Sequence, residues 1–261
     1  MTDVIAALTA EAAEFDALFA ELEADRWATP TPAPGWTVAH QVGHLAFVFQ
    51  IAGLAASDPE GFTAMTAGAA KDFDGAVNAA LQAFVNDPPE ALLGRWRAIR
   101  DTGIKALAAV PADQLVPWLV NPLPPFVLAC AGMMELFAHG QDIADALGVE
   151  RPRTDRVQFL AGFAVRVWDF GYQARGLTPP DVEFRFELTG PSGAVWTFGP
   201  EDSDQRITGD AVDFCLLVTR RRHRDDLALT AVGEHADHWL DIAQAYRGPA
   251  GEGRKPGQFR K

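Results

Sequence analysis

Two histidines four residues apart, His40 and His44, lie in the segment GWTVAHQVGHL at residues 35–45. Residues at positions i and i+4 share one face of a helix, so both imidazoles would point the same way. Imidazole nitrogen is a common ligand of zinc and of other divalent transition metals. The same spacing also occurs on exposed helix surfaces, so the pair leaves open a metal site and an ordinary helix surface.

A second polar group occurs in the segment MMELFAHGQDIADALG, where Glu135, His139 and Asp142 occupy positions i, i+4 and i+7 of an otherwise apolar pattern. Burying such groups costs several kcal/mol unless they are paired or bind a cation. Helical bundles build metal sites from inward side chains on facing helices. The two segments together leave open a metal site with an open coordination position and, as the alternative, a simple helix pair of Glu135 with His139.

The stretch LTAEAAEFDALFAELEADRWATPTPAPGWTVAHQVGHLAF resembles the opening of the mycothiol-dependent maleylpyruvate isomerase N-terminal domain, a member of the DinB-like metal-binding bundles. The pattern GWTV followed by HL, and then E and H four residues apart further along the chain, is similar to the metal signature of that family. The stretch ITGDAVDFCLLVTRR resembles its second domain. This resemblance implies that His44, Glu135 and His139 are the zinc ligands.

His40 departs from the family pattern, which more often has an acidic residue at that point. It could orient a ligand, be a fourth ligand or contact the substrate. Asp142 lies one turn beyond His139, where a carboxylate could orient the imidazole from outside the coordination sphere, or it could make an exposed salt bridge. Both residues are candidates for cofactor binding.

The resemblance implies that mycothiol, the low-molecular-weight thiol of actinobacteria, is the cosubstrate. A thiol with a pKa of about 8.5 is mostly protonated at neutral pH, and coordination to a divalent cation deprotonates it. The thiolate can add to an activated double bond and leave again, or displace a leaving group. We therefore expect a zinc-dependent, thiol-using isomerase or S-transferase that acts on a small electrophile, either anionic or neutral.

Two other functions fit the same residues. One is a metal-dependent hydrolase, lyase or isomerase that uses no thiol. The other is a metal-stabilised module that binds a small molecule without catalysis. A thiol that binds the metal would distinguish the first expectation from both.

An anionic substrate would require a cation, and TRRRHR at residues 219–224 is the one dense basic cluster. The resemblance implies that the second domain contributes an arginine from the end of this helix, and Arg220 and Arg221 fit best as catalytic residues. A solvated basic run that complements the helix dipole is the alternative. The spacing of His235 and His238 indicates a surface helix rather than a second metal site.

The charge balance limits the classes of partner. The chain has 22 Lys and Arg against 35 Asp and Glu, a net charge of −13, which argues against nucleic acid and against an anionic membrane surface. The N-terminal segment carries acids where a secretory signal carries Lys or Arg, so a cytoplasmic protein is expected. Cys130 and Cys215 have apolar neighbours and are expected to be buried thiols rather than a disulfide. The sequence makes no prediction of the oligomeric state.

Apolar residues at helical spacing, together with caps and breakers, predict a bundle of long helices joined by short Pro- and Gly-containing connections. Thr37 is the expected N-cap of one of them, and Gly148 is the expected end of another. The expected helices cover residues 3–25, 38–55, 73–85, 90–110 and 126–147, with residues 154–176 as a last bundle helix or a bridge.

From Pro179 the pattern changes to alternation with period two, and VEFRFEL and AVWTFG flank the turn signal TGPSG. A strand, a helix at 211–221, another strand and a last helix follow. The expected protein is thus mainly α: a DinB-like up-down helical bundle at residues 1–177, a small α+β domain at 178–250 and a flexible tail at 251–261.

Overall fold

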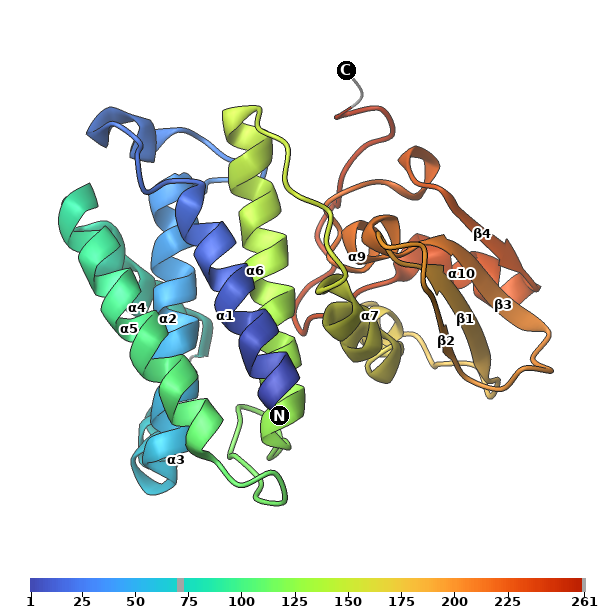
Figure 1. Ribbon diagram of the computed structural model, residues 1–261, viewed down its shortest axis with the longest axis horizontal. Helices are drawn as coiled ribbons and strands as arrows, with labels where there is room; N and C mark the ends of the chain where they lie inside the picture. Colours follow the sequence, from blue (N-terminus) through green and yellow to red (C-terminus); the bar gives the residue numbers. More distant parts are fainter. Residues whose placement is uncertain (70–72, 260–261) are drawn as a thin grey trace. The chain divides into compact units, whose positions relative to one another are not determined.

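The computed structural model describes residues 1–69 and 73–259 and divides into two compact units, Met1–Glu150 and Arg151–Lys261. The first unit is all helical (Figure 1). Its elements are α1 (Thr2–Ala17), the 3₁₀ helix η1 (Ala24–Ala28), α2 (Val38–Ser57), α3 (Pro59–Ala69), α4 (Phe73–Val85), α5 (Pro89–Ala109) and α6 (Pro125–Leu147).

Helix α2 is the central element of this bundle, because it packs against α3, α4, α5 and α6, while α1 packs against α5 and α6. Two glycines permit a close crossing of α2 and α5. A Cβ atom on Gly103 would lie 2.7 Å from the carbonyl oxygen of Phe49, and a Cβ atom on Gly53 would lie 3.0 Å from the Cα of Gly103. The position of α2 is therefore set by backbone contact as well as by side-chain packing.

Exposed and buried faces of the bundle differ sharply in chemistry. Trp96, Phe15 and Phe19 are fully buried and pack edge to face.

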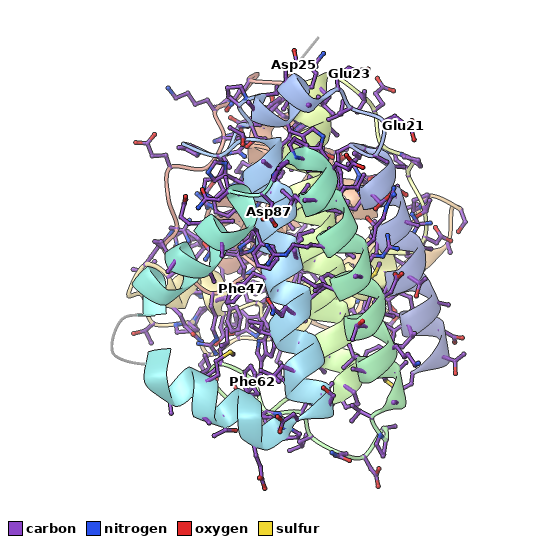
Figure 2. All side chains as sticks on the ribbon, turned by 90° about the vertical axis from the view of Figure 1, so that its left-hand side faces the viewer. Glu21, Glu23, Asp25, Phe47, Phe62 and Asp87 are labelled. Carbon is purple, nitrogen blue, oxygen red and sulfur yellow. The ribbon has the colours of Figure 1, made fainter. Side chains whose placement is uncertain are left out.

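The acidic side chains Glu21, Glu23 and Asp25 lie on the surface at one end of the bundle, consistent with the negative charge of the chain (Figure 2). Within the described residues, α2 alone is long and apolar enough to cross a membrane, and 56% of its apolar window is buried inside the bundle.

The ends of α2 and α6 follow the local signals in the sequence. Thr37 has extended backbone and caps the first turn of α2 in a capping box with His40. Pro124 and Pro125 begin α6, and Gly148 ends it in the left-handed conformation with φ of 69°. These ends fix the register of the two helices that carry the candidate ligands.

The second unit combines a four-stranded sheet with helices. Its elements are α7 (Val157–Arg166), α8 (Phe170–Gln173), β1 (Phe184–Thr189), β2 (Val195–Phe198), β3 (Gln205–Asp210), α9 (Ala211–Val218), the 3₁₀ helix η2 (Arg224–Asp226), β4 (Leu229–Val232) and α10 (Glu234–Ile242). The strand order is β2-β1-β3-β4, with β1 and β3 parallel and the other pairs antiparallel. Phe186, Phe214 and Trp239 form the centre of its core.

The structure confirms the predicted fold class, a helical bundle followed by a small α+β region. It divides the chain after Glu150, whereas the sequence pattern placed the division near residue 177. Helix α7 packs against α9 and β2, and so belongs to the second unit. Periodicity identified this segment as helical but carries no information on which neighbours cover its apolar face.

The C-terminal segment, expected as a flexible tail, makes specific contacts with the second unit. The backbone N–H of Gly257 donates to the carboxylate of Asp226 at 2.8 and 2.9 Å, and the guanidinium of Arg222 lies 4.1 Å from the ring centre of Phe259. Residues 251–259 therefore lie against the basic segment that follows α9.

Candidate metal centre

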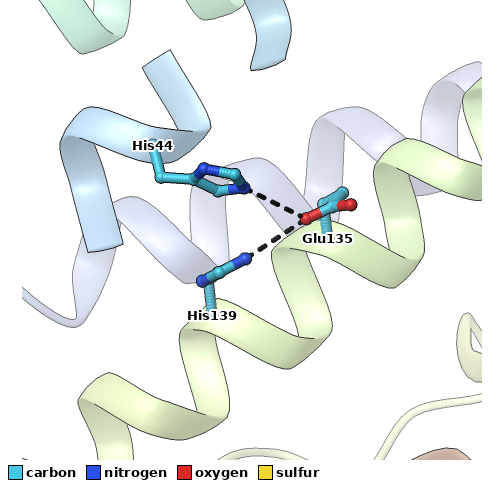
Figure 3. A group of neighbouring side chains, drawn as sticks. All are labelled: His44, Glu135 and His139. Atoms are coloured by element: carbon cyan, nitrogen blue, oxygen red, sulfur yellow. Dashed lines mark ion pairs between the residues drawn. The ribbon is translucent and has the colours of Figure 1, made fainter. Parts of the chain in front are cut away.

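Three side chains from two helices converge on one point of the bundle (Figure 3). His44 comes from α2, and Glu135 and His139 come from successive turns of α6. Oε2 of Glu135 lies 3.5 Å from Nε2 of His44 and 3.2 Å from Nε2 of His139. Across the described residues, these three form the group whose donor atoms could hold a metal ion, with all of those atoms within 4.8 Å of one another.

Two of the three donor–donor distances match those around a zinc-sized ion. Ligands at about 2.0–2.1 Å around a tetrahedral centre lie about 3.3 Å from one another. The two distances to Glu135 lie on either side of that value. His44, Glu135 and His139 would supply three ligands to such an ion, which would leave a coordination position for an exogenous ligand.

The carboxylate at this centre stays ionised. Burial alone would raise the pKa of Glu135, but hydrogen bonds and charge attraction from His139 and His44 outweigh the burial and hold its pKa well below the usual range. The three side chains are only partly exposed, at 20% for His44, 24% for Glu135 and 12% for His139. An ionised carboxylate between two partly covered imidazoles is a favourable place for a divalent cation.

Trp36 lies against both imidazoles. Its ring is stacked on that of His139 at 5.8 Å between centroids and 19° between planes, and it lies 5.3 Å from the ring of His44. Trp36, which directly precedes the N-cap of α2, therefore forms one wall of the candidate centre.

Gln41 was not identified from the sequence. It is fully buried on α2, its Oε1 lies within hydrogen-bond distance of Nδ1 of His139, and its Nε2 donates to Oγ1 of Thr31 at 2.8 Å. The available signal was an amide three residues before His44 in an otherwise apolar helix. An amide alone indicates no particular chemistry, so this signal was weak.

His40 takes part in the capping of α2. Its Nδ1 accepts a hydrogen bond from the backbone N–H of Thr37 at 3.3 Å and lies 2.8 Å from the hydroxyl of Thr37. In a capping box this position usually holds Glu or Gln, so His40 supplies the acceptor that an acidic residue would supply. Burial lowers the pKa of His40, which favours the neutral, accepting form.

The remaining candidate residues lie in two different settings. Asp142 is fully buried on α6, three residues beyond His139. Arg220 and Arg221 belong to the second unit and follow α9, which ends at Val218 rather than at residue 221. His235 and His238 are exposed on α10, as a surface helix requires.

Arg220 has an unusual backbone and side chain. Its φ is 58°, the left-handed conformation in which glycine is preferred. Its N–H donates to Leu217 O, and the N–H of Arg221 donates to Leu216 O, each at 2.8 Å, which together close α9. Nε of Arg220 is buried and has no hydrogen-bond partner within the described part of the chain. Nη2 of Arg220 donates to Gly251 O at 3.5 Å, and Nη1 of Arg221 donates to Thr219 O at 2.7 Å.

Cys130 and Cys215 are both buried, as expected. Burial raises the pKa of the Cys130 thiol to about 12, so this group stays protonated at neutral pH. Cys130 therefore provides no nucleophile to the centre.

The fold and the three converging donors define a helical bundle with a candidate metal centre. Residues 8–144 match the family described as mycothiol maleylpyruvate isomerase N-terminal domain, and residues 180–232 match the family described as wyosine base formation. The first match covers more than half of the 261 residues. The chain therefore belongs to the mycothiol maleylpyruvate isomerase N-terminal domain family.

Similar proteins extend over nearly the whole chain. Two uncharacterized proteins of Mycobacterium tuberculosis, from strains CDC 1551 and H37Rv, are each 47% identical over 250 residues, which cover 96% of this chain and 97% of theirs. The crystal structures of the mycothiol-dependent maleylpyruvate isomerase and of one mutant align with TM-scores of 0.57 and 0.60. Both are 12% identical and cover 88% of this chain and 92% of their own, a likeness that shows the fold.

Proposed function

We propose that this protein is a cytoplasmic, zinc-dependent enzyme that uses mycothiol or a similar low-molecular-weight thiol to isomerise a small electrophile, or to transfer the thiol to it. The observation that carries the proposal is the convergence of His44, Glu135 and His139 in a chain of this family. The similar solved structures are of a mycothiol-dependent isomerase, which supports the choice of a thiol.

His44 and His139 would hold the metal through Nε2, and Glu135 would hold it through a carboxylate oxygen. This mixed set of nitrogen and oxygen donors suits zinc or another divalent transition metal. Two neutral imidazoles and one carboxylate would leave one positive charge on the centre. An anionic fourth ligand such as a thiolate neutralises that charge, which favours it over a neutral ligand.

When bound, a divalent metal would lower the pKa of a coordinated thiol from about 8.5, so that the thiolate predominates at neutral pH. A thiolate is the species that can add to an activated carbon–carbon double bond, allow rotation and leave again. The protein's own residues prepare this chemistry. Glu135 stays ionised, Trp36 stacks on the imidazole of His139 and lies against that of His44, and the protonated Cys130 does not compete as a nucleophile.

We assign recognition of an anionic substrate to Arg220, with Arg221 as the second candidate. The guanidinium of Arg220 makes one long hydrogen bond, from Nη2 to the carbonyl oxygen of Gly251 at 3.5 Å, and its Nε has no hydrogen-bond partner among the described residues, so the group keeps donor capacity for a carboxylate. The guanidinium of Arg221 makes a shorter bond, at 2.7 Å, to the carbonyl oxygen of Thr219. An arginine held in a left-handed backbone is also a feature that occurs at functional sites.

Metal analysis tests the ligand assignment. Protein purified without chelators should contain one zinc per chain, and His44→Ala and His139→Ala should lose most of it. His40→Ala is the matched control, because His40 lies on the same helix but uses its Nδ1 to cap Thr37. Stoichiometric zinc in both ligand variants would refute the assignment.

Cobalt substitution tests the thiol. Mycothiol added to the cobalt-loaded protein should produce a sulfur-to-metal charge-transfer band, and it should produce none with the metal-free protein. Release of one proton per thiol should accompany the band. A cobalt spectrum unchanged at millimolar thiol would refute thiol-dependent chemistry and favour metal-bound water or a binding module.

The arginine assignment has a separate test. Arg220→Ala should leave the cobalt–thiol band intact and lower the turnover of an anionic electrophile such as maleylpyruvate, and Arg221→Ala should have a smaller effect. Arg26→Ala, which removes an exposed arginine of η1, is the control. Equal turnover in Arg220→Ala and Arg26→Ala would contradict the assignment.

A further inference from the structure

We propose that Gln41 is a positioning residue that fixes the proton of the His139 imidazole on Nδ1 and so presents an unprotonated Nε2 to the metal. The inference rests on the proposed metal centre. It concerns a residue that donates no atom to the metal and lies on the opposite edge of the imidazole ring.

A chain of hydrogen bonds determines the orientation of the Gln41 amide. The carbonyl oxygen of Trp36 can only accept, so the Thr31 hydroxyl, 3.0 Å away, must donate its hydrogen there. The oxygen of that hydroxyl is then the acceptor for the amide nitrogen of Gln41, at 2.8 Å. The amide oxygen of Gln41 must therefore face His139.

An amide oxygen has no hydrogen to donate, so Nδ1 of His139 must carry one. A neutral imidazole has only one proton. With that proton on Nδ1, the lone pair is on Nε2, the atom that lies 3.2 Å from Glu135 Oε2. The backbone carbonyl of Trp36 thus sets the protonation of a ring two hydrogen-bonded side chains away.

The surroundings of Gln41 strengthen this effect. Its side chain is fully buried, so water does not compete for the amide. The indole of Trp36 stacks on the face of the His139 imidazole, and Gln41 contacts the Nδ1 edge of the same ring. Because His44 lies on the same helix three residues later, α2 supplies one ligand of the centre and orients another.

The test is zinc affinity measured by competition with a chelator in four variants. Gln41→Leu removes the acceptor and should weaken zinc binding about 10- to 100-fold, the usual effect of losing such an outer partner. Gln41→Glu keeps an acceptor on the same stem and should restore affinity to within about threefold of the wild type, since carboxylates commonly serve this role. Thr31→Val frees the amide to turn over and should give an intermediate loss.

Val42→Ala is the matched control, because Val42 is fully buried next to Gln41 on α2 but has no polar atom. It should lower thermal stability and leave zinc affinity unchanged. If Val42→Ala weakens zinc binding as much as Gln41→Leu does, Gln41 acts through packing and the inference is wrong.

The proton itself can be observed in the zinc-loaded protein by nitrogen-15 NMR. Wild type and Gln41→Glu should show a protected N–H on Nδ1 of His139, whereas Gln41→Leu should show that proton exchanging rapidly with water. Wild-type affinity and an unchanged N–H signal in Gln41→Leu would overturn the inference but leave the metal centre intact. A wild-type protein that binds no zinc would instead overturn the proposed function.

Discussion

The close crossing of α2 and α5 makes a quantitative prediction about two glycines of the same helix. Gly103 and Gly94 both lie on α5, but a Cβ atom on Gly103 would lie 2.7 Å from the backbone oxygen of Phe49, whereas one on Gly94 would meet nothing within 4 Å. Ordinary contact begins at 3.4 Å. The helices must therefore separate by about 0.7 Å, the difference between 3.4 and 2.7 Å, to accommodate Gly103→Ala.

Two opposing contributions determine the change in stability. Replacing glycine by alanine inside a helix stabilises it by about 1 kcal/mol, and this gain is common to both variants. Overpacking against a backbone atom costs about 1–3 kcal/mol, and only Gly103→Ala incurs that cost. Gly103→Ala should therefore be less stable than Gly94→Ala by about 1–3 kcal/mol, and Gly94→Ala should be more stable than the wild type by about 1 kcal/mol.

Urea unfolding of the two variants and the wild type measures this difference directly. Zinc affinity gives a second measurement, because α2 carries His44 while α6 carries the other two candidate ligands. A displaced α2 should weaken zinc binding in Gly103→Ala and not in Gly94→Ala. Equal stabilisation of both variants would show that the crossing is not tight and would refute the reasoning.

Three other outcomes follow from the site and its surroundings. Chelation of the metal should lower the melting temperature and leave the helical circular dichroism signal in place, because the bundle core does not depend on the ion. Loss of the helical signal would mean that the metal is structural. Because the pKa of His40 is lowered in the folded protein, its contribution to stability is fully present above pH 6.5, the unfolded value, and is lost as the pH falls through the folded pKa. His40→Gln should flatten this part of the plot of stability against pH. An unchanged plot would contradict the role of His40 in the cap. Cys130, with a pKa of about 12, should resist alkylation in the folded protein at pH 8, and rapid labelling would show that it is accessible.

The resemblance to a known family singled out His44, Glu135 and His139, and the structure places their donor atoms within 4.8 Å of one another. Residue types and helical spacing alone left a metal site and an ordinary helix surface both open. The caps of α2 and α6 were also predictable, because Thr37 and Gly148 act through their own backbone geometry.

Features that depend on contacts between residues far apart in the sequence could not be predicted from the sequence. Gln41 faces His139 across 98 residues of sequence, and nothing local to Gln41 indicates that its amide would meet that imidazole. The assignment of α7 to the second unit has the same origin. The cap role of His40 escaped the sequence because histidine is uncommon at a position where acids and amides usually serve.

The left-handed backbone of Arg220 implies a conflict between stability and activity at the end of α9. An L-residue in this conformation is higher in energy than glycine by roughly 1–2 kcal/mol. A redesign that sought only a more stable protein would place glycine there and remove the guanidinium with it. If Arg220 recognises the substrate, the chain accepts a strained helix end in order to keep its charge in place, and the most stable sequence for this fold is then not the most active one.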